Sequence, residues 1–210
     1  MMKPRQLRPG DQGFTLIELM IAVAVIAIIL VIAAPSFRDM ILMQRLRSIN
    51  AQVVTDMQFA RGEAVSRSTF VRVSFQEPSD GKSCYTIYTS PSPTNSAAQQ
   101  CNCLLGVGAS CPAGSLEIRT VQVSADLSVT VSVPPLQVFD FAFDPATGGI
   151  YSIPADELSE PLDRFVVRTY IDDARELNTV INRAGRPIVC RPGTSSMTET
   201  NCVPPPPPPP

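Results

Sequence analysis

Six cysteines are the residues of this chain whose type and number most directly suggest covalent chemistry. They are Cys84, Cys101, Cys103, Cys111, Cys190 and Cys202, and all of them follow a long apolar run near the N-terminus. Cysteines on one side of such a run can form disulfides in an oxidising compartment or bind a metal ion. Structural zinc sites usually use cysteine pairs separated by two to four residues, and these cysteines lack that spacing. The pattern therefore predicts disulfides, with no metal and no cofactor.

The cysteine positions limit the possible pairings without fixing all of them. A bond between Cys190 and Cys202 is favoured. Among the other four cysteines, a direct Cys101–Cys103 bond would close a strained ring. Two pairings of those four remain open, and both tie down a polar loop over residues 90–112.

Histidine is absent from the 210 residues, which removes the commonest general base and the commonest nitrogen ligand for metals. Serine–histidine and cysteine–histidine catalysis are therefore excluded. The sequence also lacks a glycine-rich phosphate loop, an activated nucleophile and a pair of catalytic acids. The carboxylate pairs Asp172-Asp173 and Asp156-Glu157 supply too few oxygens for calcium and are interpreted as solvated turn residues. The chain is not expected to be an enzyme.

The apolar run between Phe14 and Ala34 contains one ionisable residue, Glu18. A helix over residues 14–34 would measure about 30 Å, which matches the hydrocarbon core of a bilayer. A carboxylate in such a segment costs several kcal/mol unless it finds a partner, so Glu18 is a candidate functional residue. The alternative is that Glu18 lies at the level of the lipid headgroups and has no special role.

Residues 1–13 form a leader before the apolar run, with three Lys or Arg residues and one Asp. Lys and Arg tend to remain on the cytoplasmic side of a membrane, so the part of the chain after the run should be translocated. Gly13 stands before the run, whereas a secretory signal has its small-residue cleavage site after the run. Cleavage of this leader would therefore leave the apolar segment attached to the mature protein.

The segment from Gly13 to Glu18 reads Gly-Phe-Thr-Leu-Ile-Glu and resembles the processing site of type IV pilins and type II secretion pseudopilins. The resemblance implies that a prepilin peptidase cuts after Gly13 and that the new N-terminal Phe14 is N-methylated. It also implies that Glu18 pairs during assembly with the amino group of Phe14 on a neighbouring subunit. Pro35 matches the proline that commonly bends pilin helices, and its missing N–H favours such a bend.

After Pro35, apolar residues recur every three or four positions, which predicts an amphipathic helix over residues 35–68. The recurring residues are Leu42, Leu46, Ile49, Val53, Met57, Ala60 and Ala64. This face of the helix is expected to pack on a head domain. The opposite face includes Asn50 and Asp56 and is expected to lie in water.

Residues 69–203 change to a period of two, which is typical of β-strands. Val71, Val73 and Phe75 alternate with polar residues, as in a half-buried strand. Further strands are expected at residues 84–89, 116–123, 127–133, 137–143, 164–171, 177–182 and 186–191. Short turns between them favour hairpins. The prediction is an α+β fold, in which a long N-terminal α-helix, with a membrane half and an amphipathic half, packs on a mostly antiparallel β head. Residues 204–210 are all proline and are expected to form an exposed polyproline tail.

Three segments resemble the GspH/FimT branch of the pilin-like proteins, whose members are minor pseudopilins or minor pilins. They are residues 58–64 with 71–73, residues 143–148, and Ala184-Gly185-Arg186 with Cys190. The resemblance implies a minor pilin that acts in the assembly or at the tip of a type IV pilus. The alternative within the branch is the H-type pseudopilin of type II protein secretion.

Some FimT-like members bind DNA through a C-terminal Gly-Arg-x-Arg element, which suggests a competence pilin for natural transformation as a further alternative. Ile188 occupies the position of the second arginine in this chain. Arg183 and Arg191 are the candidates that would take its place beside Arg186. The formal net charge of −2 gives no general attraction to nucleic acid, so such binding would be weak and dependent on salt.

These interpretations place the protein in the bacterial inner membrane as a single-pass protein with its head in the periplasm, and then in a pilus or pseudopilus. The expected partners are other pilin or pseudopilin subunits, the prepilin peptidase and inner membrane lipid. DNA joins this list if the protein is a competence pilin.

Overall fold

The computed structural model of the protein describes residues 13–89, 100–108, 111–135, 137, 139–153 and 162–202. The leader up to residue 12, most of the loop over residues 90–112 and the polyproline tail lie outside these residues. The chain divides into two compact units, Met1–Ile41 and Leu42–Pro210.

The helix α1 runs from Leu16 to Arg67 and contributes to both units. The bend expected at Pro35 falls on residues whose side chains lie outside the description, so it stays a prediction. Within the described residues, no single helix is long and apolar enough to cross a membrane. The two stretches Leu16–Ile32 and Ser36–Arg67 meet the requirements of length and composition only as a joined pair.

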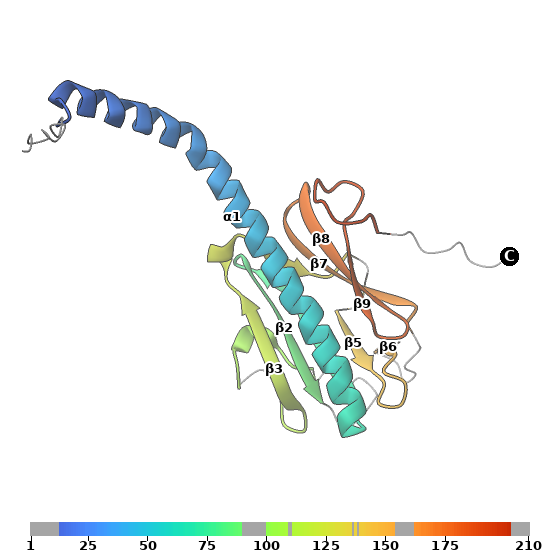
Figure 1. Cartoon of the computed structure of the whole chain (residues 1–210). Helices are drawn as coiled ribbons and strands as arrows, with labels where there is room; N and C mark the ends of the chain where they lie inside the picture. Colours follow the sequence, from blue (N-terminus) through green and yellow to red (C-terminus); the bar gives the residue numbers. More distant parts are fainter. Residues whose placement is uncertain are drawn as a thin grey trace, which may run out of the picture. The chain divides into compact units, whose positions relative to one another are not determined.

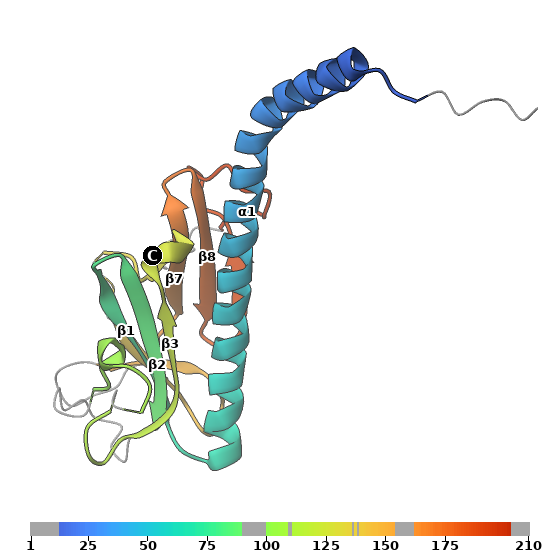
Figure 2. The same cartoon turned by 90° about the vertical axis from the view of Figure 1, so that its left-hand side faces the viewer.

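The second unit contains two antiparallel sheets (Figures 1 and 2). The first sheet has the order β3-β2-β1-β5-β6 and is made of Val71–Ser79 (β1), Lys82–Thr89 (β2), Leu116–Val123 (β3), Asp140–Phe143 (β5) and Ile150–Ser152 (β6). The second has the order β4-β7-β8-β9 and is made of Thr130–Ser132 (β4), Arg164–Asp172 (β7), Arg175–Asn182 (β8) and Pro187–Cys190 (β9). Among the described residues, two short 3-10 helices, Cys103–Leu105 (η2) and Ala125–Leu127 (η3), lie between strands.

The predicted fold class, a long helix with an antiparallel β head, is confirmed. The strand β6 was not expected, because three residues are too few to show a period. The stretch over residues 127–133 is a strand only at Thr130–Ser132, since η3 occupies its beginning.

The apolar face of α1 supplies one wall of the core. Its buried residues are Leu46, Ile49, Val53, Met57, Ala60 and Ala64, whereas Leu42 is half-buried. Aromatic rings join the two sheets, because Phe165 of β7 lies 4.3 Å from Phe141 of β5 and 5.9 Å from Phe75 of β1 between ring centroids. The apolar face predicted for the helix is therefore the one that packs on the head.

The expectation that Asn50 and Asp56 lie in water is wrong, because their exposed fractions are 3% and 1%. Asp56 accepts a hydrogen bond of 2.7 Å from the Tyr85 hydroxyl and forms an ion pair with Arg119, both in the first sheet. Asn50 accepts a bond of 3.0 Å from Thr179 in the second sheet. The helix contacts both sheets, so it buries a wider arc than a helix lying on one sheet, and polar anchors flank its apolar stripe.

The Tyr85 hydroxyl stays a hydrogen-bond donor over a wide range of pH. Burial raises the pKa of Tyr85 most, and the neighbouring Asp56 carboxylate raises this pKa further. The neutral phenol is therefore the form that donates to Asp56.

The prediction that β1 is half-buried is also wrong. Arg72 and Ser74, on the face away from Val71 and Val73, have exposed fractions of 0% and 2%. The helix η2 packs on this face of β1 and β2, so the strand is covered on both sides. Alternation of polar and apolar residues reports side-chain direction, and here the second face is covered by a loop rather than by water.

We expect Asp56→Ala to lower the free energy of unfolding by about 2–3 kcal/mol, because it leaves the buried Tyr85 hydroxyl without its acceptor and Arg119 without its carboxylate. Tyrosine fluorescence during urea unfolding of the full chain in detergent micelles measures this loss. Gln52→Ala changes an exposed residue of the same helix and serves as the control. Equal stability of the two variants would contradict the anchoring role of Asp56.

Candidate functional site

The N-terminal segment places Glu18 in the first turn of α1. The Thr15 hydroxyl accepts a hydrogen bond of 3.3 Å from the Glu18 backbone N–H, and the Thr15 carbonyl accepts one of 3.1 Å from Leu19. Thr15 therefore caps the helix, and a carboxylate at Glu18 is favoured by the positive end of the helix dipole. A threonine followed three residues later by glutamate is a known capping signal, so this cap could have been predicted from the sequence.

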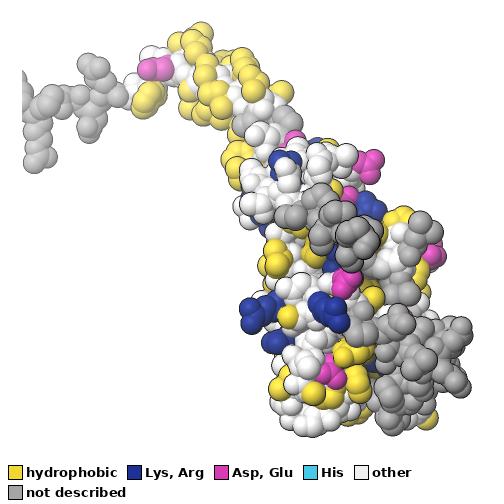
Figure 3. All heavy atoms as spheres, turned by 90° about the vertical axis from the view of Figure 1, so that its right-hand side faces the viewer, with side chains coloured by type: hydrophobic (Ala, Val, Ile, Leu, Met, Phe, Trp, Pro, Cys, Tyr) yellow, Lys and Arg dark blue, Asp and Glu magenta, His cyan; other side chains and the backbone are white. Residues whose placement is uncertain are grey.

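The apolar side chains that follow Thr15 have no cover within the described chain. All residues from 13 to 32 are exposed, with exposed fractions of 83% for Phe14, 66% for Ile17 and 50% for Val25. Figure 3 shows hydrophobic side chains gathered along this part of the helix. Apolar area in water costs roughly 25 cal/mol per Å², so a surface of this size requires lipid or protein around it.

Arg61 of α1 lies where the three segments that resemble the GspH/FimT branch meet, which are those at residues 58–64, 143–148 and 184–186. Its Nε donates hydrogen bonds of 3.2 Å to the carbonyl of Gly148, in the turn between β5 and β6, and of 3.2 Å to the carbonyl of Ala184, in the turn between β8 and β9. Each of these turns belongs to a different sheet. Arg61 therefore ties the helix to both sheets.

Two glycines make this approach possible. Gly148 and Gly185 have φ values of 66° and 73°, which L side chains rarely adopt. A Cβ on Gly148 would lie 2.8 Å from the Arg61 Nε, and a Cβ on Gly185 would overlap the Gly148 carbonyl oxygen. The turn that holds Gly148 is itself fixed by Asp144, whose carboxylate accepts two bonds of 2.7 Å from Thr147. Arg61, Gly148 and Gly185 thus have a structural role where the helix meets the two turns.

The structure does not bring the three candidate DNA-contacting arginines together. Arg191 lies at the far end of β9 from Arg186 and donates to the carbonyls of Glu199 at 2.9 Å and Ser195 at 2.6 Å. Arg183 is exposed and pairs with an aspartate at 3.6 Å. Arg186 is exposed, and its guanidinium has no partner among the residues that the structure describes, although its backbone N–H donates to the Asn182 side chain at 3.0 Å.

A different arginine lies close to Arg186. A hollow of about 360 Å³ is lined by Gln58, Arg61, Gly185, Arg186 and Pro187. None of these described residues is acidic, so the charge that they bring to the hollow is positive. The position of Arg61 beside Arg186 was not expected from the sequence, because the contact joins residues more than a hundred positions apart.

The structure contains three disulfides. They join Cys84 to Cys103, Cys101 to Cys111 and Cys190 to Cys202. The last is the pair favoured from the sequence, and the first two are one of the two arrangements that the sequence left open. Within the described residues, no group of three Cys, Asp or Glu side chains is arranged to hold a metal ion.

The third disulfide closes a C-terminal loop that reaches back to α1. Arg47 of the helix donates hydrogen bonds of 3.0 Å to the Thr198 hydroxyl and 3.2 Å to the Glu199 carboxylate. Arg191 is held inside this loop, which explains why its guanidinium faces carbonyl oxygens rather than solvent.

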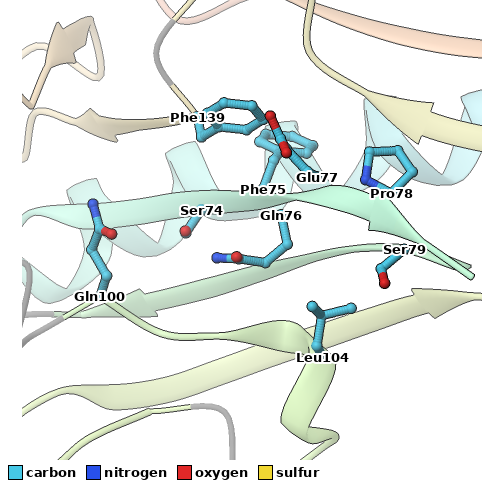
Figure 4. A pocket seen from close by; sticks show the side chains of 9 residues that line it. All are labelled: Ser74, Phe75, Gln76, Glu77, Pro78, Ser79, Gln100, Leu104 and Phe139. Carbon is cyan, nitrogen blue, oxygen red and sulfur yellow. The ribbon is translucent and has the colours of Figure 1, made fainter.

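Another hollow, of about 520 Å³, lies beside β1 and is shown in Figure 4. Gln76, Glu77 and Gln100 are among its polar lining residues, and Phe139 and Leu104 are among its apolar ones. One of these lining residues, Gln100, donates a hydrogen bond of 2.8 Å to Asp140, whose pKa is raised chiefly by burial. Glu77 is the one titratable residue of the lining, so the hollow has no acid–base pair.

We expect Gly185→Ala to lower the free energy of unfolding by about 2 kcal/mol or more, because the new Cβ forces the Gly148 turn away and strains a positive φ. Urea unfolding of the full chain in micelles measures the change. Gly193→Ala is the matched control, since a Cβ there meets nothing within 4 Å. A Gly185→Ala chain as stable as the Gly193→Ala chain would show that the two turns are not in close contact.

Two comparisons bear on the identity of the chain. A family model for the prokaryotic N-terminal methylation motif matches residues 8–34. A second family model, described as type II transport protein GspH, matches residues 51–185, which is more than half of the chain. No curated protein and no solved structure matches the chain. The processing motif and the match over most of the head together show that the chain belongs to the GspH family and is a subunit of the pilin or pseudopilin type.

Proposed function

We propose that the protein is a minor structural subunit of a type IV pilus that acts in pilus assembly or at the tip. The observation that carries this proposal is the exposed apolar surface of residues 13–32, which has one carboxylate, Glu18, in its first helical turn. Lipid covers this surface before assembly, and the helices of other subunits cover it afterwards. Membrane anchoring and assembly are then two states of the same segment.

The proposed role of Glu18 in assembly rests on the negative charge of its carboxylate. Its carboxylate has no partner among the described residues, since the bond to Thr15 uses the Glu18 backbone N–H. Cleavage after Gly13 by a prepilin peptidase would give Phe14 a positively charged amino group, and N-methylation keeps that charge. A carboxylate in an apolar filament core becomes tolerable when it meets such a group on a neighbouring subunit. The pairing would set the register between subunits.

The head is proposed to lie in the periplasm, with the helix in the inner membrane. The three disulfides support this location, because they persist in an oxidising compartment. The basic leader supports the same orientation, since Lys and Arg favour the cytoplasmic side.

The alternative is an H-type pseudopilin of type II protein secretion, which the description of the matching family names. The apolar helix and its carboxylate serve either assembly equally well. Finding the mature chain in a type IV pilus or in a type II secretion pseudopilus distinguishes the two functions.

We expect Glu18→Ala to leave leader cleavage largely intact and to reduce incorporation into filaments, because the apolar core then lacks the carboxylate that meets the amino terminus of a neighbour. The mass of the mature chain measures cleavage. Its amount in sheared pili and in isolated pseudopili measures incorporation and identifies the assembly.

Thr15→Ala is the control for this experiment, because it removes the helix cap and keeps the carboxylate. Incorporation that falls equally in both variants would mean that Glu18 acts through the helix end. Normal incorporation of Glu18→Ala would contradict the pairing outright.

A second candidate function is DNA capture by a competence pilin, and the positively charged hollow beside Arg61 and Arg186 favours it. A guanidinium that has no partner in the described structure is free to contact a phosphate. The chain is acidic overall, so two or three arginines would give weak binding that falls steeply with salt.

We expect Arg186→Ala to weaken binding of a DNA duplex by the full chain severalfold and to reduce the salt dependence by about one phosphate contact. A gel-shift titration at several salt concentrations measures both. Arg45→Ala removes an exposed arginine of α1 and serves as the control. Unchanged binding in Arg186→Ala, or equal loss in both variants, would count against DNA capture at this hollow.

A further inference from the structure

The hollow of about 520 Å³ beside β1 forms where β5 no longer runs along that strand. β5 begins at Asp140 and pairs with β1 from Val71 to Ser74. One further hydrogen bond of 2.8 Å joins the Phe75 N–H to the Phe139 carbonyl, and β1 then continues to Ser79. The last residues of β1 therefore line the hollow instead of pairing with β5.

Phe139 gives this hollow an aromatic surface. Phe141 and Phe143 follow it at every second position and are buried in the core, whereas Phe139 is 39% exposed. Figure 4 shows its ring at one side of β1, with Glu77 beside it. An exposed ring of this kind offers a flat apolar face to a ligand.

Polar side chains make up most of the remaining lining. The side chains of Gln76, Glu77 and Ser79 form no hydrogen bond or ion pair with another described residue. In Figure 4, Gln76 and Gln100 lie on the other side of the β1 ribbon from Phe139 and Glu77. Polar groups can therefore reach a ligand from both sides of the strand.

Two of the lining residues are held in place by the fold. The Gln100 side-chain nitrogen donates a hydrogen bond of 2.8 Å to Asp140, which leaves the Gln100 side-chain oxygen as an acceptor. Ser74 lines the hollow although its exposed fraction is only 2%, and its hydroxyl has no partner within the described part of the chain. A buried hydroxyl without a hydrogen bond is destabilising, and a ligand with hydrogen-bonding groups would relieve that cost.

The charge and polarity of the described lining limit the ligand class. Glu77 is its one charged residue, so a phosphate or carboxylate ligand would meet no cation. A purely apolar ligand would leave the amides and hydroxyls without partners. A sugar ring satisfies both conditions, because its C–H groups form an apolar face and its hydroxyls are neutral. Each hydroxyl both donates and accepts, which matches amide, hydroxyl and carboxylate side chains.

We propose that this hollow binds an oligosaccharide built from pyranose rings. One ring stacks on Phe139 and hydrogen-bonds to Glu77, and the adjoining unit crosses β1 to reach Gln76 and Gln100. The volume of the hollow lies within the usual range of small-molecule sites, about 300–1,000 Å³. This site belongs to the head alone, so sugar binding does not depend on the role proposed for the apolar helix.

The test measures binding of cellotriose, maltotriose and chitotriose to the full chain by isothermal titration calorimetry. Micelles of a polyoxyethylene detergent carry the protein, because a detergent with a sugar headgroup would compete for the hollow. At least one trisaccharide is expected to bind with a Kd of about 1 mM or lower, and its monosaccharide at least about tenfold more weakly. The side-chain amide NMR signals of Gln76 and Gln100 are expected to shift when the trisaccharide binds.

Two pairs of variants provide matched comparisons. Phe139→Leu is expected to weaken binding at least about tenfold, whereas Phe139→Tyr keeps the ring and is expected to bind within about threefold of the parent chain. Both retain the link between residues 75 and 139, because that hydrogen bond joins backbone atoms. Gln76→Ala is expected to weaken binding severalfold, and Gln52→Ala to leave it unchanged, because Gln52 is an exposed residue of α1 that does not line the hollow.

Three results would overturn the proposal. The first is the absence of binding by all three trisaccharides up to about 10 mM. The second is equal affinity of the Phe139→Leu and Phe139→Tyr chains for a trisaccharide. The third concerns choline, a cation that an aromatic ring beside a carboxylate could bind. A chain that binds choline and none of the trisaccharides would have a cation site in this hollow instead of a sugar site.

Discussion

The apolar surface of residues 13–32 sets the main physical constraint on this protein, because nothing within the described chain covers it. A surface of this kind can persist only in lipid or among other helices, and the proposed function uses both environments in turn. Beyond Ile41 the helix belongs to the second unit, where it packs on both sheets. The polar anchors at Asn50, Asp56 and Arg61 make that packing specific, since each reaches a defined partner in a sheet or turn.

The main features of the fold could be predicted from the sequence because they depend on the spacing of apolar residues and on the turn residues between elements. The spacing of Leu46, Ile49 and Val53 identified the buried face of the helix, and glycine-containing turns separated most strands. The errors concern polar residues whose partners are distant in the sequence. Asp56 looks like a solvated helix residue until Tyr85 and Arg119 are placed beside it. Ser74 looks exposed until η2 is placed against β1. Periodicity reports which side a residue faces, and says nothing of what lies on that side.

The candidate sites also differ in how far their residues lie apart in the sequence, and this decides which of them could be predicted. The processing segment from Gly13 to Glu18 is local, so the sequence alone could suggest it. The positively charged hollow depends on a contact between α1 and the turn after β8, and the sequence suggested Arg191 where the structure places Arg61. The position of η2 against the first sheet depends on a disulfide whose pairing the sequence left open. Long-range contacts therefore account for most of what the sequence could not show.

The junction at Arg61 also has an asymmetric tolerance to substitution. At Gly148 an added methyl group would collide with the flexible Arg61 side chain, so a shorter residue at position 61 would remove the collision and leave only the strain of the positive φ. At Gly185 the collision is with the backbone oxygen of Gly148, which no exchange of side chains can remove. A change at position 61 can therefore relieve the steric contact at position 148, whereas no side-chain exchange relieves the contact at position 185.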